Sequence, residues 1–390
     1  MIATILAATA AVSIQFAVPS VTDGRAIHGQ VDIPASPPGG VVVLVPGTGD
    51  HSRDLRLNSN PKEVPALVFR DLARRLNGAG LAVARFDKRG FSCVKQGKAG
   101  SDGWGCHDAG ETPTVTWATS AGDIEAVVRH AQAQPGGDCV ILLGHSEGTV
   151  HIARLLDEER VRPAGFIGLG PVMDSFASLL HDQAVERLTD GLLAMDKDRD
   201  GITSRAEFLA QLPGSRLAAD FDSNAECTAF CLAELEKRSP VGPAGITALE
   251  VRALRDRLQG LYHRKVEAQA GPAAPPLYAF PDGTVYSSTD WRRQVLTEWI
   301  PSAIRLSRYS GPVTLYWGTA DRQVNVAHGL AAVRRFAPRH VVNRVYEGLG
   351  HMLGVHGVAG PIREDVAQSI VADAARMAAS CSRERAAHAP

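Results

Sequence analysis

The fold is decided by the stretch Cys139-Val140-Ile141-Leu142-Leu143-Gly144-His145-Ser146-Glu147-Gly148. Its first half is a short apolar run with β-branched residues that ends at glycine, and such a run predicts a buried strand. Residues 149–156 then have the apolar spacing of a helix. A strand, the pattern G-x-S-x-G and a helix form the context of a nucleophile elbow, which holds a serine at positive φ above a sheet edge. The stretch therefore predicts Ser146 as a nucleophile, and the alternative is a glycine-rich turn with an unrelated serine.

The composition is typical of a globular protein with one large core, or with a core and an inserted subdomain. Of 390 residues, 45% are hydrophobic and 21% are charged, which are ordinary proportions. The formal net charge is −1 and the pI about 6.9, so electrostatics give no argument for a nucleic acid or an anionic membrane as partner. No apolar run reaches the roughly 18 residues that a membrane span needs.

The beginning of the chain allows two interpretations. Residues 1–12 open with an apolar run, and Ala8-Thr9-Ala10 would suit a signal-peptidase site, yet no Lys or Arg precedes the run. A minimal signal peptide and a plain apolar extension both fit this pattern.

The chain has six cysteines: Cys93, Cys106, Cys139, Cys227, Cys231 and Cys381. Cys139 lies in the strand before the serine, and we expect a buried, inert thiol there. The pairs Cys93/Cys106 and Cys227/Cys231 lie in loop-like stretches, where each could close a local disulfide. A zinc site is less expected, because neither pair adjoins a second pair of ligands. Disulfides would favour a periplasmic or secreted protein over a cytoplasmic one.

Strand and helix patterns alternate along the chain, apart from one long interruption. Strands are expected over 13–18, 26–33, 41–45, 81–87, 139–143, 165–170, 313–317 and 341–346, and helices over 64–76, 117–134, 149–156 and 361–379. The interruption has helical patterning and no convincing strand. This order predicts an α/β fold with a doubly wound, mostly parallel sheet and a helical lid insertion. The expected division is a possible extension over 1–12, core over 13–172, insertion over 173–300 and core again over 301–390.

Two residues that follow late strands are candidate partners of the serine. Asp321 lies just past the strand over 313–317, and His351 just past the strand over 341–346. In open parallel sheets the working residues lie at the carboxyl ends of strands. A serine hydroxyl needs a base to remove its proton, and the base needs an acid to orient it. Because the order Ser146, Asp321, His351 is that of α/β-hydrolases, it predicts a catalytic triad.

Each candidate has rivals. Asp174, which follows the preceding strand, could be the acid, and His356 could be the base. Taken singly, Asp321 could cap a helix and His351 could be a structural loop histidine. Hydrolysis also needs donors for the developing oxyanion. We expect these to be the backbone N–H groups of Glu147 and of Thr48, although the loop of Thr48 could be a plain turn that ends a strand.

Five segments carry a resemblance to a known family: 43–49, 86–90, 144–148, 317–321 and 348–351. On these the chain resembles the α/β-hydrolase superfamily, particularly bacterial esterases grouped with dienelactone-hydrolase-like and serine-aminopeptidase-like proteins. The resemblance covers about residues 14–172 and 300–380. Pro46-Gly47 stands where members usually have His-Gly, and Gly148-Thr149 where they often have Gly-Gly. The resemblance implies ester hydrolysis through an acyl-enzyme that water deacylates.

A second motif lies inside the insertion. Residues 196–207, DKDRDGITSRAE, fit D-x-D-x-D-G-x5-E, the calcium loop of an EF-hand. The expected Ca²⁺ ligands are Asp196, Asp198, Asp200, Ile202 (through its carbonyl), Ser204 and Glu207. Thr203 stands where the motif usually has an aliphatic residue, and no second hand is evident. The alternative is a solvated acidic turn; a single hand would be a structural calcium clip.

These observations favour a serine carboxylesterase that acts on a small-molecule ester. A peptidase or a thioesterase would use the same triad, and a calcium-dependent binding protein on an inactive hydrolase scaffold is an alternative of another class. The insertion should decide the substrate. Its aromatic residues, which could line a pocket but are mostly expected to form the insertion's own core, are Tyr278, Phe280, Tyr286, Trp291 and Trp299.

Overall fold

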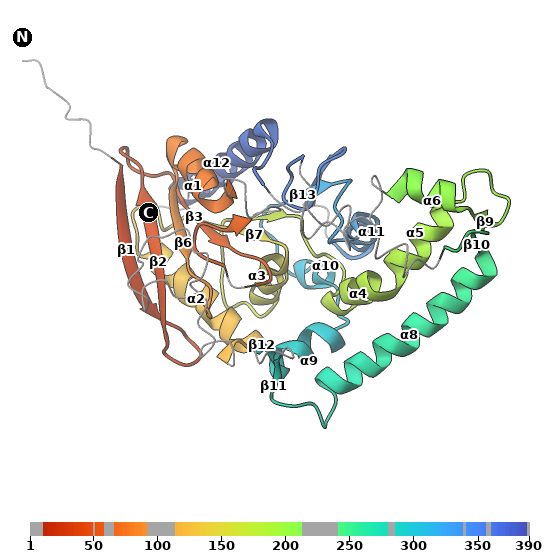
Figure 1. The fold of residues 1–390 in the computed structure, drawn as a ribbon. Coiled ribbons are helices and arrows are strands. Elements are labelled where there is room, and N and C mark those ends of the chain that lie inside the picture. The colour runs from red at the N-terminus through yellow and green to blue at the C-terminus, as the bar shows by residue number, and fades with distance from the viewer. Residues whose placement is uncertain are drawn as a thin grey trace, which may run out of the picture.

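A central sheet of eight strands organises the molecule, here described from a computed structural model (Figure 1). The structure describes residues 11–49, 51–57, 66–91, 114–212, 241–279, 285–337, 341–355 and 360–387. The strands, in spatial order, are β1 (Val12–Pro19), β2 (Ala26–Ile33), β6 (Ala82–Phe86), β3 (Val41–Val45), β7 (Val140–His145), β8 (Gly165–Leu169), β13 (Val313–Gly318) and β14 (Val341–Tyr346). β1, β2 and β6 pair antiparallel, and from β6 to β14 every pair is parallel. The predicted doubly wound, mostly parallel sheet is confirmed.

Helices cover both faces of this sheet. One face carries α1 (Val68–Gly78) and α12 (Glu364–Ala387); the other carries α2 (Trp117–Gln132), α3 (Glu147–Asp157), α10 (Ser302–Leu306) and α11 (Val326–Phe336). Strand β3 shows why the central strands are apolar throughout. Val41, Val43 and Val45 pack toward the second set of helices, while Val42 and Leu44 pack toward the first. Every residue of a strand covered on both faces is buried.

Residues 173–300, which we call the inserted segment, lie between β8 and β13. They contain α4 (Phe176–His181), η3 (Asp182–Glu186), α5 (Arg187–Met195), β9 (Ile202–Thr203), α6 (Arg205–Gln211), β10 (Ile246–Thr247), α8 (Ala248–Ala270), β11 (Leu277–Ala279), β12 (Val285–Ser288) and α9 (Thr289–Thr297). The expectation that this segment has no strand is wrong, because β9 pairs with β10 and β11 with β12. These strands are too short to give an apolar alternation that sequence can show.

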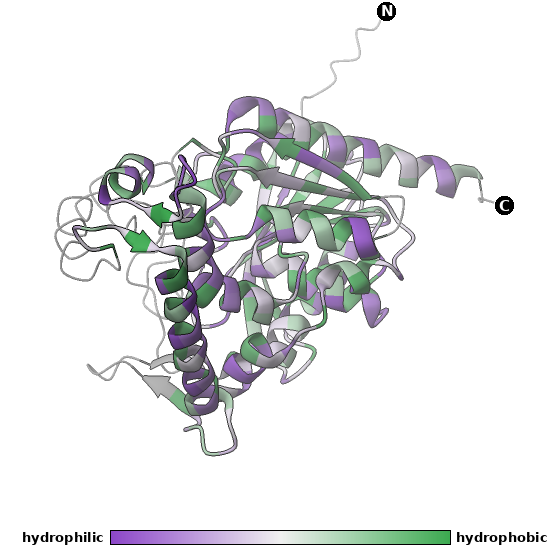
Figure 2. Ribbon diagram, turned by 90° about the vertical axis from the view of Figure 1, so that its right-hand side faces the viewer, coloured by the Kyte–Doolittle hydropathy of each residue, from purple (hydrophilic) through white to green (hydrophobic). Residues whose placement is uncertain are grey.

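Part of the inserted segment has a hydrophobic core of its own, which includes Leu192, Phe208, Ile246 and Val251. The long helix α8 runs on the outside of the molecule from β10 to β11 (Figure 1), and hydrophilic and hydrophobic residues are interspersed along its length (Figure 2). Tyr262 is one of its few buried residues.

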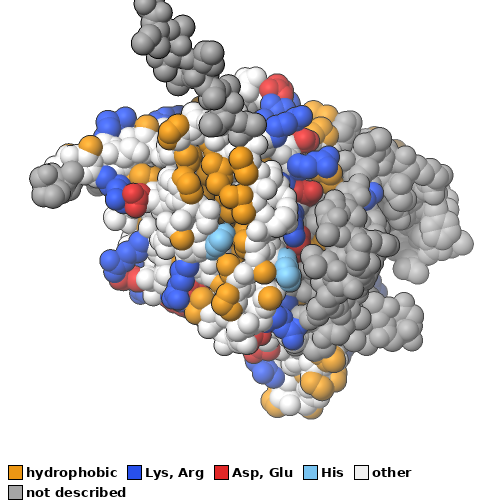
Figure 3. Space-filling view, turned by 90° about the vertical axis from the view of Figure 1, so that its left-hand side faces the viewer, with side chains coloured by type: hydrophobic (Ala, Val, Ile, Leu, Met, Phe, Trp, Pro, Cys, Tyr) orange, Lys and Arg blue, Asp and Glu red, His pale blue; other side chains and the backbone are white. Residues whose placement is uncertain are grey.

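Two smaller features complete the fold. A short ladder joins β4 (Arg56–Leu57) to β5 (Ala66–Leu67) ahead of α1. Hydrophobic side chains gather on the face of the molecule where β1 lies (Figure 3), and Val12 and Ile14 of this edge strand are exposed. Within the described residues, no helix has both the length and the apolarity required to traverse a bilayer.

Cys139 is bonded to Cys381, and the expectation of a free, inert thiol at Cys139 is therefore wrong. The disulfide joins the residue just before β7 to the C-terminal part of α12 across 242 positions of sequence. The two cysteines meet only because α12 packs back on the sheet, so local spacing could not predict the pair. The pairs Cys93/Cys106 and Cys227/Cys231 lie outside the described residues.

We expect the double variant Cys139→Ala/Cys381→Ser to be less stable than the wild type by about 2–4 kcal/mol, because a bond between distant residues restricts the unfolded chain. Urea unfolding under oxidising conditions measures the difference. Reductant should destabilise the wild type more than the variant. Equal unfolding midpoints for both proteins without reductant would contradict the assignment.

Candidate active site

Ser146 lies in a strained turn between β7 and α3. Its φ is 52° and its ψ −122°, a conformation that non-glycine residues rarely adopt. The backbone around it is crowded. A Cβ on Gly148 would lie 2.5 Å from the Val45 carbonyl oxygen, and one on Gly144 would lie 2.8 Å from the Ile152 side chain. Both glycines of G-x-S-x-G are thus required by close packing, as in a nucleophile elbow.

Asp321 and His351 are brought together from two different loops. Nδ1 of His351 lies 2.7 Å from Oδ2 of Asp321, and both side chains are buried. The other carboxylate oxygen of Asp321 accepts hydrogen bonds from the N–H groups of Gln323 at 2.8 Å and Val324 at 2.9 Å. Because a carboxylate accepts the Nδ1 proton, Nε2 of His351 is left free to take a proton from another group.

Close approaches between loops place Ser146 and His351 at the same edge of the sheet. The ring of His145, next to Ser146, lies 4.8 Å from the ring of His351, centroid to centroid. A Cβ on Gly170, just after β8, would lie 2.8 Å from Nδ1 of His351, and one on Gly47, after β3, would lie 2.9 Å from the Ser146 Cβ. The carboxyl ends of the parallel strands therefore converge on one site, as expected for this class of sheet.

The rival residues lie in other settings. Asp174 accepts hydrogen bonds from the Ser175 N–H at 2.8 Å and the Ser178 hydroxyl at 2.7 Å. Asp174 thus bonds to the start of α4, whose N-cap is Ser175, whereas His351 is paired with Asp321. His356 lies outside the described residues.

The side chain of Glu147, the residue after Ser146, is fully buried. Oε1 accepts hydrogen bonds from Nε2 of His151 at 3.0 Å and Nε1 of Trp291 at 3.1 Å, and Oε2 lies 3.5 Å from Nζ of Lys88. Burial raises the pKa of Glu147, but the Lys88 charge and the two hydrogen bonds outweigh it and hold this pKa well below its ordinary value. The carboxylate is therefore charged, and sequence reasoning assigned no role to it.

Two further histidines lie beside the site and are neutral at pH 7. His145 is buried and neither ring nitrogen has a hydrogen-bond partner. Burial lowers its pKa well below the ordinary value, and the neighbouring His351 and His51 add to this effect. Burial and the charge of Lys88 lower the pKa of His51 to about 4. No charge from either ring opposes a positive charge that forms on His351.

The inserted segment holds the loop that carries Asp321. Nε2 of Gln183 donates a hydrogen bond to the carbonyl of Gln323 at 2.8 Å, and the guanidinium of Arg187 donates one to the carbonyl of Arg322 at 2.9 Å. Because both bonds end on backbone carbonyls next to Asp321, this segment fixes the loop independently of the loop's side chains.

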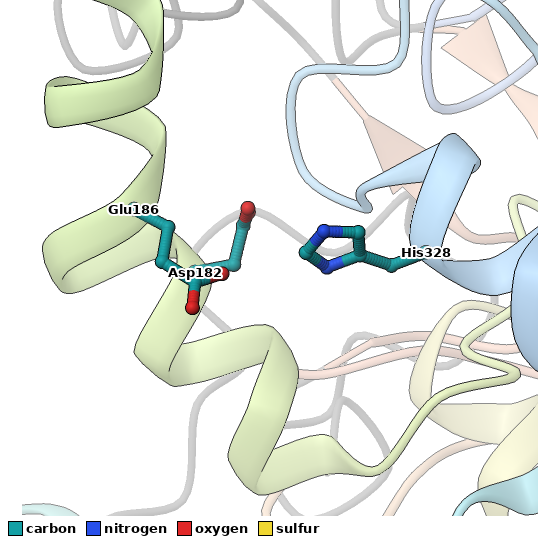
Figure 4. Close-up of side chains that lie close together, drawn as sticks. All are labelled: Asp182, Glu186 and His328. Carbon is teal, nitrogen blue, oxygen red and sulfur yellow. The ribbon is translucent and has the colours of Figure 1, made fainter.

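A charged cluster lies at the same junction. Asp182 and Glu186 face His328 of α11 (Figure 4). Asp182 accepts a hydrogen bond from Nδ2 of Asn325 at 2.9 Å, and Glu186 lies 3.2 Å from Nδ1 of His181. Since each carboxylate already has a protein partner, the cluster links the inserted segment to α11, and we assign no ligand to it.

The predicted calcium loop connects α5 to α6. At its sixth position Gly201 has a φ of 87°, and its N–H donates to Oδ2 of Asp196 at 3.0 Å. The other oxygen of Asp196, Oδ1, is buried without a hydrogen-bond partner. Carboxylate oxygens of Asp196, Asp198 and Glu207 lie within 4.8 Å of one another.

The remaining predicted ligands take part in local hydrogen bonds. Asp200 accepts from the N–H of Ile202 at 2.8 Å. Glu207 accepts from the N–H of Lys197 at 2.8 Å and the hydroxyl of Ser204 at 2.8 Å. These bonds, with the Lys197 N–H as the first contributor, lower the pKa of Glu207, so its carboxylate is charged. An oxygen-rich, acidic set of this kind suits a hard cation such as Ca²⁺.

The loop over 196–207 also has a partner loop, which sequence reasoning missed. Ile202 and Thr203 pair antiparallel with Thr247 and Ile246. Residues 241–247 precede helix α8 as the acidic loop precedes α6, but they contain no carboxylate. A search for acidic ligands could not find this loop, because only its backbone and the glycine at 245 resemble the first.

Comparisons with known proteins agree with this architecture. A family model described as "Serine aminopeptidase, S33" matches residues 36–213. Est1E from Butyrivibrio proteoclasticus is similar in structure, with a TM-score of 0.50 at 14% identity over 94% of this chain and 99% of that chain. A highly thermostable carboxyl esterase from Bacillus coagulans gives a TM-score of 0.52 at 16% identity over 94% and 99% of the two chains. A comparison with curated proteins gives no match. The chain has the α/β-hydrolase fold.

We expect acid to destabilise the folded protein through His145. In the unfolded chain a histidine gains a proton as the pH falls below about 6.5, whereas the folded state keeps His145 neutral. The unfolded state then binds more protons than the folded state. The free energy of unfolding therefore decreases as the pH is lowered, by up to about 1.4 kcal/mol per pH unit for this group.

Urea unfolding between pH 7 and pH 5 measures this dependence. His145→Phe, which replaces a ring without hydrogen bonds, should give a shallower decline, and His263→Ala, at an exposed position of α8, should leave the slope unchanged. A slope that is the same in His145→Phe as in the wild type would contradict the prediction.

Proposed function

We propose that this protein is a serine hydrolase that cleaves carboxylic esters of small molecules through an acyl-enzyme on Ser146. One observation carries the proposal: a buried His351–Asp321 pair, joined at 2.7 Å, shares a sheet edge with a serine held at a φ of 52°. Each of these features costs free energy to maintain, and a nucleophilic site explains both together.

The mechanism follows from the roles of the individual atoms. Oγ of Ser146 attacks the ester carbonyl, while Nε2 of His351 takes the hydroxyl proton. Asp321 stabilises the imidazolium that forms and keeps its orientation. The N–H groups of Glu147 and Thr48 would donate to the developing oxyanion. The imidazolium then protonates the leaving alcohol. A water molecule, deprotonated by His351, next attacks the acyl carbonyl, and the imidazolium returns the proton to Oγ of Ser146 as the acid leaves.

A peptidase is the second candidate, because the matching family model is described as a serine aminopeptidase. A thioesterase would use the same atoms. The chemistry at Ser146 is common to all three, so substrates must separate them. p-Nitrophenyl esters of increasing chain length should be compared with aminoacyl anilides and acyl thioesters. Faster turnover of anilides than of esters would support the peptidase.

We expect Asp321→Asn to lower kcat on p-nitrophenyl butyrate by about 10⁴-fold, because an amide in place of the carboxylate favours the wrong tautomer of His351. Ser146→Ala should abolish labelling by a fluorophosphonate probe. Asp174→Asn, at the rival acid, should retain wild-type turnover.

These variants also test the different-class alternative of a binding protein on an inactive scaffold. A wild type that does not label, or a Ser146→Ala variant that labels equally well, would refute the enzyme assignment.

We further propose that residues 196–207 bind a structural Ca²⁺. Asp196, Asp198, Asp200, the carbonyl of Ile202, Ser204 and Glu207 would hold the ion. The buried, unpaired Oδ1 of Asp196 favours this assignment, because an oxygen atom removed from solvent without a donor is costly unless a cation occupies its remaining side. The ion would stabilise the inserted segment and takes no part in the steps above.

Removal of the ion should be measurable as a loss of thermal stability. We expect chelator to lower the Tm of the wild type and to leave that of Asp196→Ala unchanged, because only the wild type would bind Ca²⁺ in the folded state. Glu250→Ala, which removes the equivalent helix cap beside the partner loop, should lower the Tm yet keep the chelator effect. A wild type that is insensitive to chelator would leave only an acidic loop.

The disulfide between Cys139 and Cys381 supports a location in an oxidising compartment, such as the periplasm or the exterior of the cell.

A further inference from the structure

We infer that Lys88 is a positioning residue for the oxyanion loop, and that the buried carboxylate of Glu147 serves as its counter-ion. This inference rests on the proposed function and adds a role for two charged side chains that the triad does not use. Lys88 lies two residues after the end of β6, and its side chain is 12% exposed. Nζ donates a hydrogen bond to the carbonyl of Gly47 at 2.7 Å.

Because the peptide bond is planar, the contact between Lys88 and the Gly47 carbonyl also determines the direction of the Thr48 N–H. The carbonyl of Gly47 and the N–H of Thr48 belong to one trans peptide unit, in which the two groups point in opposite directions. Lys88 holds the carbonyl on its own side of the loop, so the Thr48 N–H is directed to the opposite side. That N–H is the predicted second donor to the oxyanion, and Gly47 packs directly against Ser146.

The next peptide unit is fixed in the same way. Nε2 of His51 lies 2.7 Å from the carbonyl oxygen of Thr48, and since a carbonyl can only accept, the ring nitrogen is the donor. Two consecutive carbonyls of the loop therefore have donors that prevent the peptide units from turning over. A loop made of Pro46-Gly47-Thr48-Gly49 needs such restraint, because its glycines allow many conformations.

Glu147 explains how a lysine can be largely removed from solvent at this position. An ammonium group away from water requires a compensating charge, and Oε2 of Glu147 lies 3.5 Å from Nζ. The hydrogen bonds from His151 and Trp291 go to the other oxygen, Oε1, so Oε2 remains directed at Lys88. Glu147 thus has two roles at the oxyanion site. Its N–H is a predicted donor, and its carboxylate holds the ammonium group of Lys88, which orients the Thr48 N–H.

A purely structural ion pair would have the same distances, so the test must separate stability from catalysis. Lys88→Met removes the donor but leaves Glu147 without its counter-ion, and should lower both stability and kcat. Lys88→Met/Glu147→Gln removes both charges, which should restore most of the thermal stability. We expect kcat on p-nitrophenyl butyrate to remain about 10²-fold below the wild type in both variants, with KM changed less than threefold, because the donor acts mainly in the transition state.

Arg305→Met is the matched control. Its side chain is also 12% exposed and pairs with Asp157, but it belongs to α10 and does not contact the oxyanion loop. It should lose stability and keep wild-type kcat in the folded protein.

The outcomes distinguish this inference from the proposed function on which it rests. A wild type that hydrolyses the ester and labels with a fluorophosphonate, together with a double variant of wild-type kcat, overturns the role of Lys88 alone. A loss confined to KM also overturns it. A wild type that neither hydrolyses nor labels overturns the proposed function and the inference together.

Discussion

Ser146 is held at positive φ because the backbone around it leaves no room for the turn to relax. Gly148 packs against the carbonyl of Val45, the last residue of β3, and Gly47 packs against Ser146. The N–H of Ser146 donates to the carbonyl of Leu169 at 3.0 Å, which ties the turn to β8 as well. The strain of about 1–3 kcal/mol that such a conformation costs is therefore borne by three neighbouring strands. The positions of the oxyanion loop and of His351 follow from the same packing.

Buried charge has a specific place in this arrangement. The carboxylate of Glu147 lies behind Ser146 with three donors, whereas the histidines beside the His351–Asp321 pair are kept neutral by burial. In the proposed mechanism, positive charge near His351 would oppose formation of the imidazolium, and negative charge close to the oxyanion would oppose that intermediate. The Lys88–Glu147 pair is locally neutral, so it can orient the loop without adding a net charge to the site.

The sequence predicts the features that depend on local pattern. The strands over 26–33, 41–45 and 341–346 have their predicted bounds. The run over 41–45, for example, is apolar throughout and lies between Gly40 and Pro46. The sequence order predicts that Ser146, Asp321 and His351 lie at one edge of the sheet, because parallel strands place their carboxyl ends there. Contacts of side chains with backbone atoms could not be predicted. Lys88 donates to a backbone carbonyl. Because any residue type can supply a carbonyl, the segment Phe86-Asp87-Lys88-Arg89-Gly90 does not by itself predict the acceptor of Lys88.

Long-range pairs escaped prediction for a related reason. Cys139 can bond to Cys381 only because α12 packs against the sheet. Strand β9 pairs with β10 through backbone hydrogen bonds, although their two loops share no acidic pattern. In each case the partner is selected by tertiary position, while sequence reasoning favours partners nearby. The local pairings suggested for the other cysteines have the same bias, since they rest on spacing alone.

The inserted segment is attached to the site at two ends, and this limits how it can move. On the Ser146 side, Trp291 of α9 donates to Glu147. On the Asp321 side, Gln183 and Arg187 donate to carbonyls of the loop that carries Asp321. A rigid opening of the segment would break all three bonds, and the loss at Glu147 would leave a buried carboxylate with fewer donors, which is the most costly of the three. Any opening of the segment that spares these bonds must therefore leave α9, η3 and the start of α5 in place.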